Sequence, residues 1–355
     1  MQRIALNRTA ANRTVPWVAF AVGLTVAPFV LSGAHARLQL IMVLLYSLLA
    51  VSWNLTLGLA GIFNFAQIAF FGIGAYTTAV LCTRSGLSPW IAMLVSASTA
   101  ALAAVVAFLP VLRLRGIYVG LVTYVFAQLC VYLVLGQREL TGGSNGVVGL
   151  PDLTVGSLNF YDDDRLGYYF LGAVLLFAVC LAFALLTRSR LGLSLVALRN
   201  NEALAASRGV RRARQQLAAF VIGAAVAGVA GSYQAFVNSV VSTDVFGFGY
   251  LTILLSMIFL GGRRSNPGTI VGVVVITVLS DVLADSGAWQ QIISSAITLV
   301  VLWLFPDGLA GLARSWGGRG LLRLIRPAAA ATPPAQSVDR VRDDPALRDS
   351  LAADR

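Results

Sequence analysis

YYFLGAVLLFAVCLAFALL (residues 168–186), TRSRLGLSLVALRNNEALAASRGVRRARQQ (187–216) and LAAFVIGAAVAGVAGSYQAFVNSV (217–240) follow one another directly along the chain. Each outer stretch is long enough to cross a bilayer as a helix, because about 20 mostly apolar residues span the hydrocarbon core. The middle stretch is polar and carries seven arginines against one acid, Glu202. This alternation predicts two membrane helices joined by a basic loop outside the lipid.

The composition of the whole chain has the same character. Hydrophobic residues make up 58% of the 355 residues and charged residues 12%, whereas about 25% of the residues in a soluble domain are charged. Long apolar runs favour helices, which satisfy their own backbone hydrogen bonds in lipid. The sequence therefore predicts an all-α, polytopic integral membrane protein.

Ten apolar segments can be distinguished. They cover residues 15–32, 38–57, 62–82, 89–112, 117–135, 168–186, 217–240, 250–260, 269–283 and 289–305. The eighth and ninth are short, which predicts half-helices or tilted helices around the break at 261–267. Five segments precede the acidic loop 136–167 and five follow it, so the second set starts on the opposite side of the membrane. This arrangement predicts an inverted five-plus-five repeat.

The arginines predict the orientation, because basic residues concentrate in cytoplasmic loops. A cytoplasmic N-terminal segment 1–14 places the clusters at 113–115, 187–216, 263–264 and 314–326 on the same side, and leaves Asp244 with the other acidic connections outside. We expect a permease-like transmembrane domain at 15–310, with an external loop at 136–167 and a cytoplasmic loop at 188–215. A largely disordered cytoplasmic tail at 311–355 completes the chain. As an alternative, Ala34-His35-Ala36 imitates a signal-peptide cleavage site.

Missing residue types exclude several functions. All 26 basic residues are arginine, so the chain lacks the lysine of a Walker A phosphate loop, and another subunit must bind any ATP. His35 is the only histidine, and Cys82, Cys130 and Cys180 lie singly in or beside apolar stretches. No metal site, disulfide or cofactor is therefore indicated. Nothing indicates a nucleic-acid partner.

Polar and small residues interrupt the third apolar segment. They are Asn64, Gln67, Gly72, Gly74 and Tyr76. Amides are costly in lipid unless they face a cavity or another helix, and glycines let helices approach closely. Two interpretations follow: these residues form a wall of a substrate path, or they are helix-packing contacts whose amides bond neighbouring backbone.

A short docking helix is predicted inside the basic loop. Its residues are Arg199, Asn200, Asn201, Glu202, Ala205, Ala206 and Gly209. Either asparagine can cap the helix, Glu202 suits its positive end, and Gly209 can end it in the left-handed conformation. The alanines leave a small, smooth surface that the cleft of a partner can accept. The arginines at 211, 212 and 214 are expected to meet anionic lipid.

Short motifs occur in order over roughly residues 40–310. They are Asn54 to Gly58, Gly61, Asn64-Phe-Ala-Gln67, Phe70-Phe-Gly-Ile-Gly-Ala-Tyr76, an external-loop motif formed by Thr141, Gly142, Gly143, Ser144, Asn145 and Gly146, Ala197 to Gly209, Ala218 to Gly231, and Pro306-Asp-Gly-Leu309. Together they resemble the permeases of branched-chain amino acid ABC transporters, the LivM type. Leu193 and the pair Arg263 and Arg264 depart from the pattern of that family.

The resemblance implies a non-enzymatic membrane subunit of an ABC importer for branched-chain amino acids, in the cell inner membrane. It implies a homologous second permease, ABC ATPase subunits and a soluble substrate-binding protein as partners, besides membrane lipids and the small-molecule amino acid substrate. A urea or amide permease of the same superfamily is the main alternative. A secondary transporter would need charges deep in its spans, which hold almost none. A membrane enzyme would need Asp162, Asp163 and Asp164 to hold Mg²⁺.

Overall fold

The computed structural model describes residues 20–30, 33–155, 158–160, 162–262, 266–283 and 296, all within a unit that ends at Gly311. The predictions for 1–14, for segment 289–305, for the tail 311–355 and for Arg263 and Arg264 lie outside the described residues.

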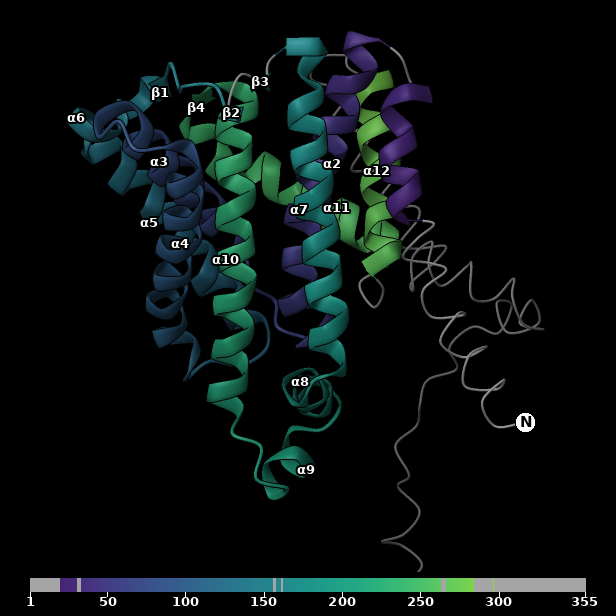
Figure 1. Cartoon of the computed structure of the whole chain (residues 1–355). Helices are drawn as coiled ribbons and strands as arrows, with labels where there is room; N and C mark the ends of the chain where they lie inside the picture. The colour runs from purple at the N-terminus through teal and green to yellow at the C-terminus, as the bar shows by residue number, and fades with distance from the viewer. Residues whose placement is uncertain are drawn as a thin grey trace, which may run out of the picture. The chain divides into compact units, whose positions relative to one another are not determined.

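Most of the described chain is helical. The helix Phe20–Val30 and α2 (Ala34–Asn54) come first, and a short π-helix, η1 (Leu55–Leu59), continues α2. The following helices are α3 (Gln67–Arg84), α4 (Pro89–Val111), α5 (Ile117–Gly136), α6 (Arg138–Thr141), α7 (Asp162–Arg188), α8 (Arg190–Asn200), α9 (Glu202–Ser207), α10 (Arg212–Asn238), α11 (Phe248–Gly261) and α12 (Asn266–Val282) (Figure 1). Two 3-10 turns, η2 (Gly143–Asn145) and η3 (Thr243–Phe246), lie between them.

Several helices have the length and composition of membrane spans. Five in the described part are long and apolar enough to cross a bilayer: Ala34–Leu59, Pro89–Val111, Ile117–Gly136, Arg165–Arg188 and Arg212–Asn238. Three shorter apolar helices, Phe20–Val30, Phe248–Gly261 and Asn266–Val282, accompany them. The last two occupy the eighth and ninth predicted segments and are short, as predicted. A polytopic helical membrane protein is therefore confirmed.

Four strands of two residues each accompany the helices in the described part of the chain. Strand β1 (Val147–Val148) pairs antiparallel with β4 (Val240–Val241), and β2 (Thr154–Val155) pairs with β3 (Leu158–Asn159). The β1–β4 pair fastens the long loop after α5 to the chain that follows α10. Backbone groups at the end of a membrane helix need hydrogen-bond partners, and these short ladders supply them.

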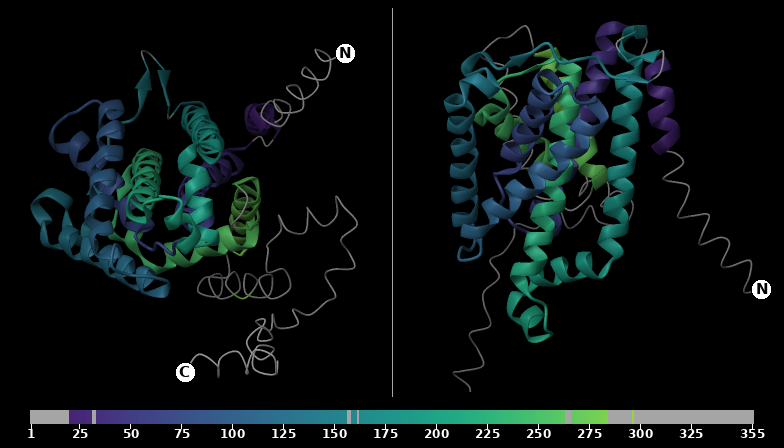
Figure 2. Two further views of the ribbon diagram at one scale, coloured as in Figure 1. Left: turned by 90° about the horizontal axis from the view of Figure 1, so that it is seen from below. Right: turned by 60° about the vertical axis from the view of Figure 1, so that its left-hand side comes forward.

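Small residues bring α3, α4 and α10 together (Figure 2). A Cβ atom on Gly74 of α3 would lie 2.3 Å from the carbonyl oxygen of Gly228 in α10, and one on Gly231 would lie 2.0 Å from the carbonyl oxygen of Phe71. Gly228 also lies against Ser96 of α4, whose carbonyl oxygen would be 2.6 Å from an added Cβ. Helices in lipid associate through such close contacts, because the lipid is as apolar as the side chains.

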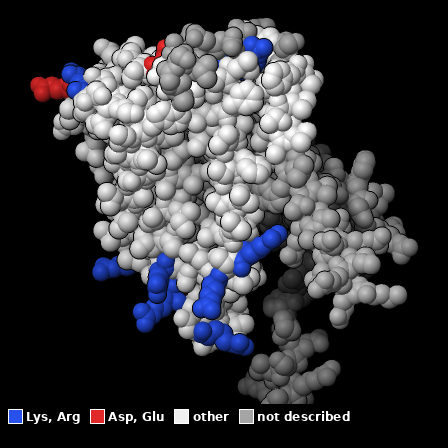
Figure 3. All heavy atoms as spheres, viewed as in Figure 1, with Lys and Arg blue, Asp and Glu red and all other residues white. Residues whose placement is uncertain are grey.

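The two ends of the described unit differ in charge. Figure 3 shows basic side chains gathered at the end that carries α8 and α9, and both acidic and basic side chains at the opposite end. The arginines at 113, 115, 188, 190, 199, 208, 211 and 214 are exposed. The arginine clusters at 113–115 and 187–216, which the sequence assigns to one side of the membrane, thus share one end of the molecule.

The lone histidine and the cysteines have structural surroundings. His35, expected in a connection, lies in the first turn of α2, and its Nε2 atom is 3.2 Å from a carboxylate oxygen of Asp281 in α12. Cys82, Cys130 and Cys180 are free thiols, each only 6% exposed. These thiols behave as small apolar side chains in the helix interfaces.

Candidate functional site

The first element of the candidate site is a break between α2 and α3. Segment 62–82 was predicted as one helix, but α3 begins only at Gln67, and residues 60–66 are not helical. Gly61 adopts a φ of 71°, in the left-handed region, which glycine enters without a steric penalty. The Asn64 carboxamide oxygen accepts a hydrogen bond from the backbone of Ala66 at 3.0 Å and stabilises the turn into α3.

Gln67 links three helices at this break. Its side chain is fully buried and donates to the Ser52 hydroxyl in α2 at 2.8 Å and to the carbonyl oxygen of Gly223 in α10 at 3.0 Å. The Asn64 amide lies 3.5 Å from the Gln67 carboxamide oxygen. In this conformation both amides bond within the chain, as the helix-packing interpretation expects. Their part in a substrate path stays a prediction.

The next residues of α3 face η3. A Cβ atom on Gly72 would lie 2.2 Å from the ring of Phe246, and Tyr76 stacks on that ring with centroids 5.9 Å apart. The Tyr76 hydroxyl is buried and has no hydrogen-bond partner among the residues the structure describes. Gly72 therefore makes room for Phe246, and Gly74 makes room for α10.

The basic loop contains two helices, where one was expected. Ser189 caps α8 by accepting a hydrogen bond from the backbone of Gly192 at 3.3 Å. The buried Leu195 and Leu198 are spaced as on one face of a helix. Together with the capping serine, this spacing is the signal in the sequence that predicts α8. Arg199 and Asn200 belong to α8 and not to the docking helix.

The docking helix itself, α9, is shorter than predicted but ends as predicted. The Asn201 side chain accepts from the backbone of Leu204 at 3.0 Å, and Gly209 has a φ of 83°. Ala205 is buried against the chain, whereas Leu204 and Ala206 are exposed. The exposed surface of α9 is therefore small and mostly apolar.

Glu202 holds α9 against its neighbours. One of its carboxylate oxygens lies 3.3 Å from Arg115, before α5, and 3.3 Å from Arg212, at the start of α10. The Arg212 guanidinium also donates to the carbonyl oxygen of Leu114 at 3.0 Å. These partly exposed ion pairs each add little stability, but together they fix the direction of α9.

Arg199 connects the basic loop to the break after α2. Its guanidinium donates to the carbonyl oxygen of Gly58 in η1 at 2.5 Å. Its aliphatic part covers Gly61, where an added Cβ would lie 2.6 Å from Cγ of Arg199. The sequence placed these residues in separate motifs, and the fold makes them neighbours.

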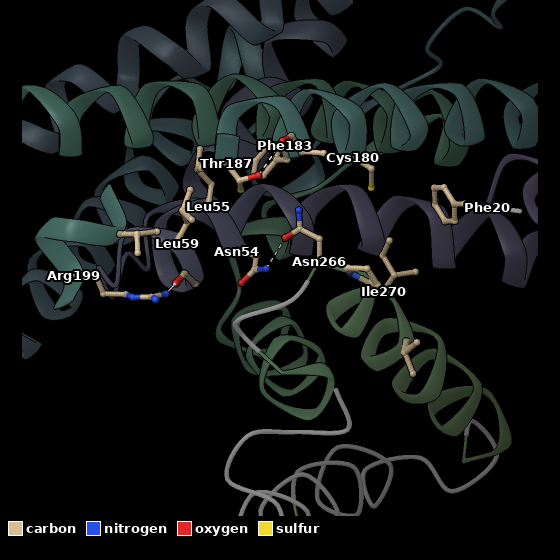
Figure 4. Close-up of a pocket in the computed structure, with 15 residues that line it drawn as sticks. Phe20, Asn54, Leu55, Leu59, Cys180, Phe183, Thr187, Arg199, Asn266 and Ile270 are labelled. Carbon is tan, nitrogen blue, oxygen red and sulfur yellow. Dashed lines mark hydrogen bonds between the residues drawn. The ribbon is translucent and has the colours of Figure 1, made fainter. Parts of the chain in front are cut away.

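A cavity of about 920 Å³ adjoins the same contact. It lies between α2–η1, α7, α8 and α12, and Figure 4 shows Arg199 at one end and Phe20 at the other. Its walls are mostly apolar. The Asn54 amide donates to the Asn266 carboxamide oxygen at 2.8 Å, while the Asn54 oxygen is buried without a partner in the described part of the chain. Apolar walls with a few fixed polar groups suit a small amphipathic molecule.

The predicted external-loop motif forms a compact turn. Gly142, Gly143 and Gly146 have φ values of 72°, 60° and 72°, and the Thr141 hydroxyl donates to the carbonyl oxygen of Val134 at 2.6 Å. A Cβ on Gly146 would lie 2.2 Å from the Val241 carbonyl oxygen. The glycines thus bring the loop against the segment after α10. Ser144 and Asn145 remain exposed at its tip.

Asp162, Asp163 and Asp164, expected in the external loop, form the first turn of α7.

Comparison with known proteins identifies relatives over most of the chain. The family profile described as "Branched-chain amino acid transport system / permease component" matches residues 38–305. The high-affinity branched-chain amino acid transport system permease protein LivM of Escherichia coli is 29% identical over 331 residues, covering 87% of this chain and 78% of the relative. LivM of Salmonella typhimurium is 30% identical over 308 residues, with 81% and 72% covered. LivH of Salmonella typhimurium is 26% identical over 289 residues, with 75% and 91% covered. No solved structure matches the chain.

Proposed function

This chain belongs to the branched-chain amino acid transport permease family, and on that premise we propose that it is one membrane subunit of an ABC importer for leucine, isoleucine and valine. It has no ATP site of its own and works with ABC ATPase subunits, a second, homologous permease and a soluble binding protein. Leucine and its relatives pass between the two permeases. Asn64, Gln67, Gly72, Gly74 and Tyr76 are the residues we propose to place along that path.

The observation that carries this proposal is the connection between α9 and the break after α2. The exposed Ala206 and Leu204 of α9 offer a partner a small surface, and Glu202 fixes that surface against α5 and α10. Arg199, which precedes α9, bonds Gly58 in the broken region. Movement imposed on α9 by an ATPase thereby has a short physical route into the membrane helices.

We further propose the topology that the sequence suggests. Ten spans form two inverted sets of five in the inner membrane of the cell. Both chain ends and the basic loop face the cytoplasm, and loop 136–167 faces outside. One feature supports the repeat: each half contains a long helix, α2 or α10, followed by an interruption of the α-helical structure and a further helix, α3 or α11. The gathering of arginines at the end that carries α8 and α9 supports the orientation.

Replacing Ala206 with glutamate tests the coupling role of α9. The complete transporter, reconstituted in proteoliposomes with its binding protein, should still assemble and hydrolyse ATP but should lose most uptake of radiolabelled leucine. Ala206→Ser, which adds only a hydroxyl, is the matched control and should transport normally. Undiminished uptake by Ala206→Glu would refute the docking role. Uptake of urea or a simple amide in place of leucine would favour the amide-permease alternative.

A further inference from the structure

The segment between α10 and α11 descends into the helix bundle. Sequence analysis placed Asp244 in an outside connection, yet α11 begins deep among other helices. The ring of Phe248 lies 6.1 Å from Tyr124, in the first half of α5, and Tyr250 lies 6.5 Å from Tyr46 of α2. At 1.5 Å per residue, Tyr46 is about 18 Å along α2 from its start. Figure 1 likewise places α11 below β4.

Asp244 lies two residues before Phe246, whose ring packs against Gly72 and Tyr76 of α3, so this acid stands close to the interior of the helix bundle. It is the second residue of η3, and one carboxylate oxygen accepts a hydrogen bond from the Ser242 hydroxyl at 3.0 Å. Its side chain is exposed with respect to the described residues. A carboxylate that faces lipid is strongly destabilising, so acids among membrane helices face a water-filled path or another protein.

Groups of complementary chemistry surround Asp244. Phe246, two residues after Asp244, stacks on Tyr76 with ring centroids 5.9 Å apart, and the Asp244 carbonyl oxygen accepts a hydrogen bond from the backbone of Gly247, just before α11, at 2.8 Å. The Tyr76 hydroxyl is buried and unpartnered among the described residues. The short helix α11 starts at Phe248, two residues after Phe246, and no side chain among the described residues caps its first turn. Phe248, 62% exposed, adds an apolar surface beside these groups.

This combination matches the backbone of a free amino acid. A carboxylate binds an ammonium group, while a phenol hydroxyl and the N–H groups that begin a helix bind a carboxylate. In transporters, half-helices that start within the membrane direct their positive ends at anionic groups of the substrate. The aromatic surface of Phe248 suits an aliphatic side chain.

We propose that Asp244, the Tyr76 hydroxyl and the N-terminus of α11 form an intramembrane site for a zwitterionic α-amino acid, with Asp244 on the ammonium group. The inference rests on the proposed function as an amino acid permease and adds the residues that recognise the substrate backbone. In this proposal Asp244 contacts the substrate, whereas the hydrogen bonds of Gln67 hold helices together.

The test compares Asp244→Asn and Asp244→Glu in the complete, reconstituted transporter. Asparagine keeps the size of the side chain and can still accept from Ser242, but it removes the charge. We expect ATP-driven uptake of radiolabelled leucine to fall at least tenfold in Asp244→Asn, with ATP hydrolysis and assembly retained, and to recover in part in Asp244→Glu. Asp152→Asn, an exposed acid of the external loop, is the control and should transport normally.

Tyr76→Phe supplies a second variant, because it removes only the unpartnered hydroxyl and should lower leucine uptake several-fold. Wild-type uptake by Asp244→Asn, or equal loss in the asparagine and glutamate variants, would overturn the site while leaving the proposed function intact. A wild-type transporter that carries no amino acid at all would overturn the proposed function and this site together.

Discussion

Replacing Gly74 with alanine should loosen the crossing of α3 and α10. The added Cβ would lie 2.3 Å from the carbonyl oxygen of Gly228 and 2.5 Å from its Cα. Because both are backbone atoms, the clash cannot be relieved by a side-chain rotation. The helices must separate by about 1 Å to restore an ordinary contact, and overpacking of this kind costs about 1–3 kcal/mol. Alanine would by itself favour a helix by about 0.5–1 kcal/mol, so the clash decides the sign.

Thermal unfolding of the purified protein in detergent measures this effect. Gly74→Ala should lower the midpoint by several degrees, since 1 kcal/mol shifts it by roughly 2–4 °C in a chain of 150–250 residues. Gly23→Ala is the control, because no atom lies within 4 Å of a Cβ at that helical glycine, and its midpoint should hold or rise. A Gly74→Ala midpoint equal to or above wild type would refute the close crossing of these helices.

Three other substitutions test single contacts. Gln67→Leu removes the buried side-chain hydrogen bonds to Ser52 and to the Gly223 carbonyl oxygen and should cost about 1–3 kcal/mol in thermal unfolding; an unchanged midpoint would contradict the buried network. Gly61→Ala should destabilise the fold by about 1 kcal/mol through the positive φ of this position, and further through the clash with Arg199. In a double-mutant cycle, Arg199→Ala should recover only the loss caused by the clash. Strictly additive effects of the two substitutions would argue against their contact. Asn201→Ala removes the α9 cap, worth about 1 kcal/mol, and should speed hydrogen exchange of the α9 amides roughly fivefold; exchange at the wild-type rate would rule out the capping bond.

The sequence predicts local features well where one physical rule acts. The docking helix has the expected asparagine cap and glycine stop, because capping depends on residues only three positions apart. The short eighth and ninth segments follow from hydropathy alone. In contrast, α8 was missed because its leucines lie among arginines, and the strand pair β1–β4 was missed because two-residue strands have no periodicity to detect.

Long-range features could not be read in the same way. Arg199 and Gly58 are 141 positions apart, and the bond between them arises only when α8 folds beneath η1. Asp244 was placed outside because hydropathy treats a short polar turn as a connection at the surface. The structure lowers that turn into the bundle, since Gly72 leaves space there for the ring of Phe246. A rule that counts charges per segment cannot detect that a turn packs among helices.

The burial of all three cysteines has a practical consequence. Maleimide reagents attack the thiolate in water, and Cys82, Cys130 and Cys180 are each only 6% exposed. A cysteine introduced at an exposed position such as Ala206 would therefore be labelled much faster than Cys82 and Cys130. Spin labels or fluorophores attached there can report distances and motion of α9 during turnover, once Cys180, which lines the cavity in Figure 4, has been replaced.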